Sequence, residues 1–158
     1  MSSNNQQLET MRHSLAHIMA AAALELWPAV KFAIGPAIEN GFYYDFDFGD
    51  KKISDADLAG IEKKMEHLIK KNMKFEREEM DIEEAIEREK KKGQIYKSEL
   101  LNDLKKEGEK KVSYYELGNF TDLCRGPHVE SAGKIKKGSF RLTKIAGAYW
   151  RGDEKSAM

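Results

Sequence analysis

Apolar residues recur near the start of the chain at the three- and four-residue steps of an α-helix. This stripe over residues 8–26 consists of Leu8, Met11, Leu15, Ile18, Ala22 and Leu26. Trp27-Pro28 ends the predicted helix, because proline cannot continue it. His13 and His17 fall on the other side, one turn apart and among alanines. A helix that is apolar nearly all round is buried on two sides, so we expect both histidines to face an enclosed cleft.

A hairpin is predicted next, with strands over residues 31–38 and 42–48. Asn40-Gly41, between them, is a dipeptide that favours a tight turn. In the second strand, apolar aromatic residues alternate with residues suited to the other face. This period of two places Tyr44 on the apolar face, where its hydroxyl needs a partner.

A helical insert is expected over residues 54–108. Its predicted elements are a helix over 54–71 capped by Ser54, a strand near 74–79, a charged helix over 81–92 and a short helix over 98–104. Gly93 is expected to stop the charged helix. Residues 93–97 are predicted as a loop that holds Lys97 beside a tyrosine.

From residue 112 onward the pattern favours strands, over 112–117, 120–124 and 139–145. The predicted fold is therefore α+β, with a mainly antiparallel sheet packed on a central helix that bears the histidines. A length of 158 residues fits one domain with a sizeable core. We expect a polar lead-in over 1–10, the domain over 11–153 and a tail or start of a linker over 154–158.

Charge and cysteine content narrow the functional classes. The 27 basic and 27 acidic residues balance, which argues against a strongly basic nucleic-acid-binding protein. One cysteine excludes an internal disulfide and suits the cytoplasm. No apolar run approaches the roughly 20 residues that span a bilayer, and the polar start does not resemble a secretory signal.

A local basic strip is hidden by the neutral total. Residues 131–151 contain basic side chains and no acidic ones: Lys134, Lys136, Lys137, Arg141, Lys144 and Arg151. Solvated surface lysines are the simpler interpretation. Six charges of one sign nevertheless slightly favour contact with a phosphate backbone, and we take the first five as candidate nucleic-acid-binding residues.

The segment from Phe120 to His128 concentrates reactive side chains: Asp122, Cys124, Arg125 and His128. With His13 and His17 it gives three histidines and one cysteine, a ligand set typical of zinc. A second interpretation needs no metal, because a histidine can act as a general base or orient water. Cys124 as a nucleophile is a weaker alternative, since its spacing from His128 alone does not align the pair.

Four motifs together resemble the editing domain of bacterial-type threonyl-tRNA synthetases. They are His13-Ser-Leu-Ala-His17, Ile34-Gly-Pro-Ala-Ile-Glu-Asn-Gly-Phe-Tyr-Tyr-Asp45, Thr121-Asp-Leu-Cys-Arg-Gly-Pro-His128 and Ala146-Gly-Ala-Tyr-Trp-Arg-Gly-Asp153. The resemblance implies hydrolysis of Ser-tRNA(Thr), the product of misactivated serine. It implies that His13, His17, Lys97, Asp122, Cys124 and His128 form the catalytic set. Tyr44 and Arg125 are expected to bind the substrate.

The resemblance also implies that the site works without a metal and that this domain has no other cofactor. Alanyl relatives, in contrast, use zinc. The partners expected are the acceptor end of a serine-carrying tRNA(Thr) and, if the domain is excised, the rest of the synthetase. No membrane is expected as a partner. The chain is thus expected to be either an excised domain or a freestanding editor. Two alternatives stay open: a zinc-dependent alanyl-type editor with ligands His13, His17, Cys124 and His128, and a non-catalytic module that binds the tRNA acceptor end.

Overall fold

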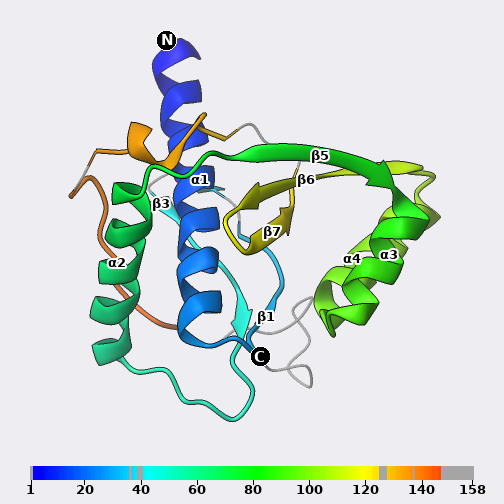
Figure 1. Cartoon of the computed structure of the whole chain (residues 1–158), viewed down its shortest axis with the longest axis horizontal. Coiled ribbons are helices and arrows are strands. Elements are labelled where there is room, and N and C mark those ends of the chain that lie inside the picture. Colours follow the sequence, from blue (N-terminus) through cyan, green and yellow to red (C-terminus); the bar gives the residue numbers. More distant parts are fainter. Residues whose placement is uncertain (1, 36, 39–40, 125–127, 137, 147–158) are drawn as a thin grey trace.

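The computed structural model describes residues 2–35, 37–38, 41–124, 128–136 and 138–146. The chain contains both helices and short strands: four strands follow α1, and α3 and α4 are consecutive (Figure 1). The elements are α1 (Ser2–Leu26), β1 (Lys31–Phe32), β2 (Ala37–Ile38), β3 (Gly41–Phe42), β4 (Phe46–Asp47), α2 (Asp55–Lys70), β5 (Glu76–Asp81), α3 (Ile82–Lys91), α4 (Ile95–Lys106), β6 (Lys111–Leu117), β7 (Phe120–Leu123) and the 3-10 turn η1 (Ala132–Lys134). All strand pairs are antiparallel, which confirms the α+β class.

Helix α1 begins at Ser2, six residues before the predicted start, so the expected polar lead-in forms its first turns. The helix contacts α2, β2, β3 and β7. Its alanines from Ala20 to Ala23 are at most 5% exposed, because small side chains let neighbouring elements approach from more than one side. α2 begins after Ser54 as predicted, and the Ser54 amide donates a hydrogen bond of 2.8 Å to Oδ2 of Asp57.

The predicted hairpin is present but interrupted. β1 pairs with β4 and β2 pairs with β3, so four short strands replace the two continuous ones. Gly41 is paired with Ile38 in the ladder, and residues 39 and 40, which the hairpin turn would use, lie outside the described residues. Tyr44 is 7% exposed, which confirms its predicted burial. Its ring lies so close to Gly35 that an added Cβ there would be 2.1 Å from ring carbon Cδ2.

The second sheet has the order β5-β6-β7. Strand β7 alternates, with Phe120 and Asp122 buried and Thr121 and Leu123 partly exposed. α3 and α4 lie side by side at the end of the long β5–β6 ribbon, away from α2 (Figure 1). α2 packs into the core built on α1, while α3 and α4 share a second core with β6. The range 54–108 is thus divided between two cores.

Two further predicted elements differ from the structure. Residues 139–146 form no strand, although Phe140 is buried in the main core. An apolar side chain can be buried from irregular backbone as well as from a strand, and the pattern alone does not distinguish them. Residues 93–97 are not a loop: Gln94 is the N-cap of α4, so Lys97 lies in its first turn.

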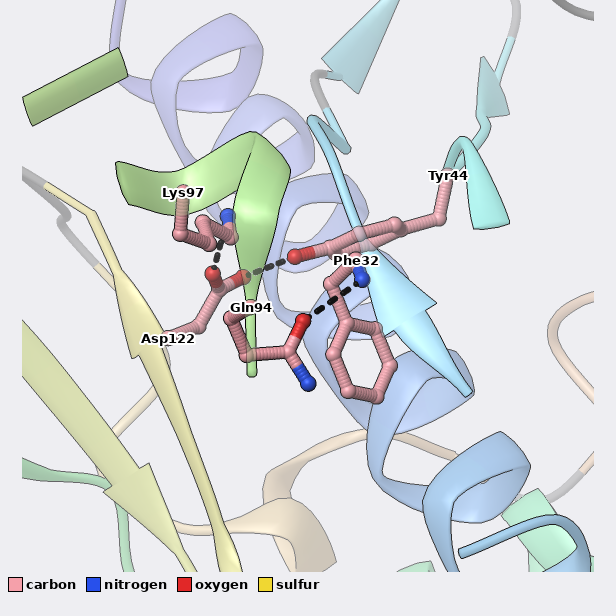
Figure 2. Close-up of polar contacts among 5 residues, drawn as sticks. All are labelled: Phe32, Tyr44, Gln94, Lys97 and Asp122. Carbon is pink, nitrogen blue, oxygen red and sulfur yellow. Dashed lines mark hydrogen bonds and ion pairs between the residues drawn. The ribbon is translucent and has the colours of Figure 1, made fainter. Parts of the chain in front are cut away.

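Gln94 attaches α4 to the outer edge of β1 with its side-chain amide. Oε1 accepts a hydrogen bond of 2.9 Å from the Phe32 amide, and Nε2 donates one of 3.2 Å to the Val30 carbonyl. Figure 2 shows the first of these contacts. Tyr96 adds a second attachment, donating its hydroxyl to Oδ2 of Asp47 on β4 at 2.6 Å. The start of α4 is therefore held to the β1–β4 pair.

We predict that Gln94→Ala lowers the free energy of unfolding by roughly 1–3 kcal/mol, because the buried Phe32 amide loses its acceptor. Urea denaturation measures this loss, and hydrogen exchange should show a faster Phe32 amide. Glu87→Ala, on the exposed side of α3, is the control and should change stability by less than about 0.5 kcal/mol. Equal stability of the two variants would contradict the attachment.

Candidate functional site

A buried ion pair joins α4 to β7. Nζ of Lys97 lies 2.7 Å from Oδ1 of Asp122, and the two residues are 6% and 7% exposed. The Tyr44 hydroxyl donates a hydrogen bond of 2.9 Å to Oδ2 of the same carboxylate. Figure 2 shows Lys97 and Tyr44 converging on Asp122 from different elements. Both carboxylate oxygens are therefore occupied by donors from segments far apart in the sequence.

The ion pair keeps Asp122 charged despite its burial. Burial opposes ionisation, but the Lys97 charge, the nearby His17 and hydrogen bonds from Lys97 and Tyr44 hold the pKa of Asp122 below its usual value. The pKa of Tyr44 is raised well above its usual value by burial and by the Asp122 charge. At neutral pH the site thus contains a carboxylate and a neutral phenol that donates to it.

His17 lies in an aromatic enclosure on the β7 side of α1. Its ring centroid is 4.7 Å from that of Phe120 and 5.2 Å from that of Phe75. The residue is 2% exposed, and neither ring nitrogen has a hydrogen-bond partner within the described part of the chain. Buried polar atoms are normally satisfied, so these two nitrogens are available to a water or a substrate.

His128 packs against His17, with ring centroids 5.0 Å apart. Phe75 stacks on its ring at 4.9 Å and Tyr115 meets the ring edge-on at 4.6 Å. Nδ1 lies 3.1 Å from the Ser14 hydroxyl, whereas Nε2 has no partner in the described structure. The His13 ring is 6.4 Å from His128. Three histidines therefore surround a common region beside the Asp122 ion pair.

The enclosure keeps His17 and His128 neutral. Burial lowers the pKa of His17 from 6.5 to about 4, with Asp122 opposing this and Lys97 reinforcing it. Burial, together with the His17 and His13 charges, lowers the pKa of His128 to about 3, with Asp122 opposing. A neutral imidazole has one nitrogen that can accept a proton, which suits it to hold or deprotonate a water molecule.

The remaining predicted site residues are placed less centrally. Cys124 is partly buried, and its backbone amide donates a hydrogen bond of 3.0 Å to the Ser113 carbonyl. A charge on its thiol contributes to raising the pKa of Tyr44, so the thiol is within electrostatic range of that hydroxyl. Arg125 lies outside the described residues, and its predicted substrate contact stays a prediction.

Four of the five predicted tRNA-binding residues are exposed: Lys134, Lys136, Arg141 and Lys144. Lys137 lies outside the described residues. Arg141 and Lys144 also line a groove between α1, α2 and residues 139–146, on the face of α1 away from His17. The basic strip is thus available to a phosphate backbone.

Sequence reasoning missed three residues that shape the site. Ser14 contacts His128, Phe75 packs against the rings of both histidines, and Gln94 fixes the helix that carries Lys97. Ser14 gave a weak signal, since a serine beside two histidines on a predicted buried helix needs a partner. Glu89 was also missed: it is 3% exposed on α3, and burial is the main cause that raises its pKa.

The chemistry of the histidines fits a transition metal, since neutral imidazole nitrogens without partners are its usual ligands. Within the described residues, however, no three His, Cys, Asp or Glu side chains are grouped to hold a metal ion. The same part of the chain has no helix long and apolar enough to cross a membrane.

Residues 112–158 match the family model described as the threonyl and alanyl tRNA synthetase second additional domain. The chain is 54% identical to a threonine–tRNA ligase of Dehalococcoides mccartyi, over 96% of this chain and 25% of that protein. Threonine–tRNA ligases of a Geobacter species and of Acetivibrio thermocellus are 52% and 51% identical, over 97% and 95% of the chain and 23% of each ligase.

Almost the whole chain is therefore similar to one part of the threonine–tRNA ligases, and residues 112–158 match the additional domain of threonyl and alanyl tRNA synthetases. The chain spans about a quarter of the length of the curated relatives it matches. The resemblance inferred from the four sequence motifs is therefore confirmed at the level of the family. Asp122 and His128 lie within residues 112–158, which match the additional domain, whereas His17, Tyr44 and Lys97 lie in the part of the chain that is similar to the ligases alone.

We predict that acid destabilises the folded chain partly through His17. Between pH 6.5 and about 4 the unfolded chain binds a proton at this histidine and the folded chain does not, so stability falls as pH falls. At about 1.4 kcal/mol per unit of pKa, the loss from His17 between pH 7 and pH 4.5 is roughly 2 kcal/mol. His17→Gln should reduce the stability loss between these pH values by about this amount, measured by urea denaturation at both.

His67→Gln is the matched control, because His67 lies on the exposed side of α2. It should retain the pH dependence of the wild type. An identical pH dependence in His17→Gln would show that His17 is not held neutral by burial.

Proposed function

We propose that this domain edits by hydrolysis, releasing serine from Ser-tRNA(Thr). The observation that carries the proposal is the buried constellation of neutral histidines beside the Lys97–Asp122 pair. It occurs in a chain whose relatives are threonine–tRNA ligases. Editing is needed because binding discriminates by only ~1–3 kcal/mol between substrates that differ by one methylene-sized group.

In the proposed reaction, a water held by an unprotonated histidine nitrogen attacks the ester carbonyl. The water oxygen becomes part of the carboxyl group of free serine, and the ester bond to the ribose oxygen breaks. The proton removed from the water returns to that ribose oxygen, so no other reagent is consumed. Lys97 stabilises the negative charge that develops on the carbonyl oxygen. Asp122 holds the Lys97 ammonium group in place, and Tyr44 fixes the second carboxylate oxygen.

Selectivity for serine is assigned to close packing. Threonine has one methyl more than serine, and attraction alone would favour the larger substrate. The α1 face that carries His13 and His17 also carries Ala20, which is fully buried, and Tyr44 lies opposite across the Asp122 carboxylate. A filled wall of this kind tolerates an added methyl poorly. The polar groups beside it hold the seryl hydroxyl and amine, and the exposed lysines bind the tRNA acceptor end.

Zinc-dependent hydrolysis is the second candidate, favoured by the unpartnered nitrogens of His17 and His128. Cys124 and His13 would complete its ligand set, and the metal would activate the water. Asp122 and Lys97 would keep the same roles in orientation and charge stabilisation.

We predict that the domain deacylates Ser-tRNA(Thr) much faster than Thr-tRNA(Thr). His13→Ala and Lys97→Ala should slow Ser-tRNA(Thr) hydrolysis by about 10²-fold or more, as loss of an acid–base group or an oxyanion donor does. Tyr44→Ala should chiefly accelerate hydrolysis of Thr-tRNA(Thr). Tyr44→Phe, which keeps the ring and loses only the hydroxyl, is its matched control and should retain rejection of threonine. Deacylation of both substrates by each variant gives these rates.

Similar rates for both esters in the wild type would refute the steric account of selectivity. A passive tRNA-binding module would hydrolyse neither ester, and His13→Ala would then change nothing. The first outcome would refute the steric explanation of selectivity, and the second would refute the assignment as a hydrolase.

We predict that hydrolysis persists after dialysis against a chelator, because the Lys97–Asp122 pair and the neutral histidines provide charge stabilisation and a proton acceptor. The measurement is the deacylation rate before chelation, after it and after zinc is returned. Activity that is lost on chelation and recovered with stoichiometric zinc would establish the zinc-dependent alternative.

A further inference from the structure

Ser14 lies one residue after His13 on α1 and is fully buried. Its hydroxyl oxygen has three neighbours at hydrogen-bond distance. The Thr10 carbonyl oxygen is 2.8 Å away, the Val129 amide nitrogen 2.9 Å and Nδ1 of His128 3.1 Å. Nothing in the editing mechanism above uses this side chain, yet it is the hydrogen-bond partner of one catalytic histidine.

The hydrogens around Ser14 can be counted. A serine hydroxyl has one hydrogen to donate and two lone pairs. The Thr10 carbonyl can only accept, and two oxygens 2.8 Å apart would repel without a hydrogen between them, so the hydroxyl donates there. The Val129 amide can only donate and takes one lone pair. The second lone pair is left for His128.

His128 must then donate to Ser14, which places the ring hydrogen on Nδ1. A neutral imidazole has a single ring hydrogen, so Nε2 carries the lone pair. Nε2 is buried, without a partner in the described residues, in a ring whose centroid is 5.0 Å from that of His17. The lone pair is therefore available inside the histidine cluster, where a water would be held.

We propose that Ser14 is a positioning residue that fixes the Nδ1–H tautomer of His128 and so makes Nε2 the proton acceptor of the site. The catalytic part of this inference rests on the proposed editing function. The tautomer itself does not, because it follows from the Thr10, Val129 and His128 contacts alone. In this arrangement Ser14 on α1 determines which ring nitrogen of His128, 114 positions later in the chain, has the lone pair that accepts a proton.

The test is a nitrogen NMR measurement of the histidine rings in the 158-residue chain, dialysed against a chelator at pH 7. Protonated and unprotonated ring nitrogens have distinct shifts, so the spectrum reports each tautomer. The chain has only four histidines, and single His→Gln variants assign them. We expect His128 to carry its hydrogen on Nδ1 in the wild type and to shift toward the Nε2–H form in Ser14→Ala. Ser14→Thr, which retains a hydroxyl, should restore Nδ1–H.

Ser98→Ala is the matched control, because the Ser98 hydroxyl is also buried on a helix but has no partner in the described residues. It should leave the His128 tautomer unchanged. In deacylation assays Ser14→Ala should lower kcat by about 10-fold or more with little change in KM, since a histidine in the wrong tautomer cannot accept the proton. A purely structural role would not move the tautomer.

Nε2–H in the wild type would overturn the inference, and this measurement needs no variant to fold. Nδ1–H retained in a folded Ser14→Ala would also overturn it. A shifted tautomer with unchanged kcat would overturn the catalytic part. A wild type that shows Nδ1–H but hydrolyses neither ester would refute the editing proposal and support the assignment of the tautomer.

Discussion

The site depends on one constraint: a buried carboxylate must have charged or hydrogen-bonding partners. Asp122 meets this requirement with Lys97 and Tyr44, which come from α4 and from the segment between β3 and β4. Removing one partner of a buried ion pair is strongly destabilising, because the other charge is left unsatisfied. The pair therefore forces three distant segments into one arrangement, and it does so beside the histidines of α1.

The histidine cluster differs from the ion pair because its buried groups are uncharged. Phe75, Phe120 and Tyr115 pack around the neutral rings of His17 and His128, and within the described residues neither ring nitrogen of His17 nor Nε2 of His128 has a hydrogen-bond partner. Charge is concentrated at Asp122 and Lys97, whereas proton-accepting capacity is concentrated at the imidazoles. A low-dielectric surrounding strengthens the interaction of each group with a substrate. The ion pair and the histidine cluster thus provide different chemistry within one site.

Sequence patterns over a few neighbouring residues correctly predicted the helix ends and burial that depend on those residues alone. The capped start of α2, the end of α3 at Gly93 and the burial of Tyr44 follow from period, cap and turn residues. The helical position of Lys97 was missed, because Gln94 caps α4 while bonded to β1, a contact 62 residues away. Residues 139–146 have strand-like composition, but no neighbouring strand is available in the described sheets. Motifs identified the reactive side chains, whereas the partner of Ser14 and the position of Phe75 depend on long-range contacts that a local pattern does not contain.

The side-chain amide of Gln94 also has a consequence for the behaviour of the protein in a crowded solution. Val30 and Phe32 expose one carbonyl and one amide on the outer edge of β1, the groups through which a foreign strand would add. The side-chain amide of Gln94 bonds to these two groups as the peptide group of a neighbouring strand would. Unlike a strand, it presents no further backbone groups with which another strand could pair. The attachment of α4 therefore also closes a route to intermolecular β-pairing, and a domain that loses it becomes prone to aggregation as well as less stable.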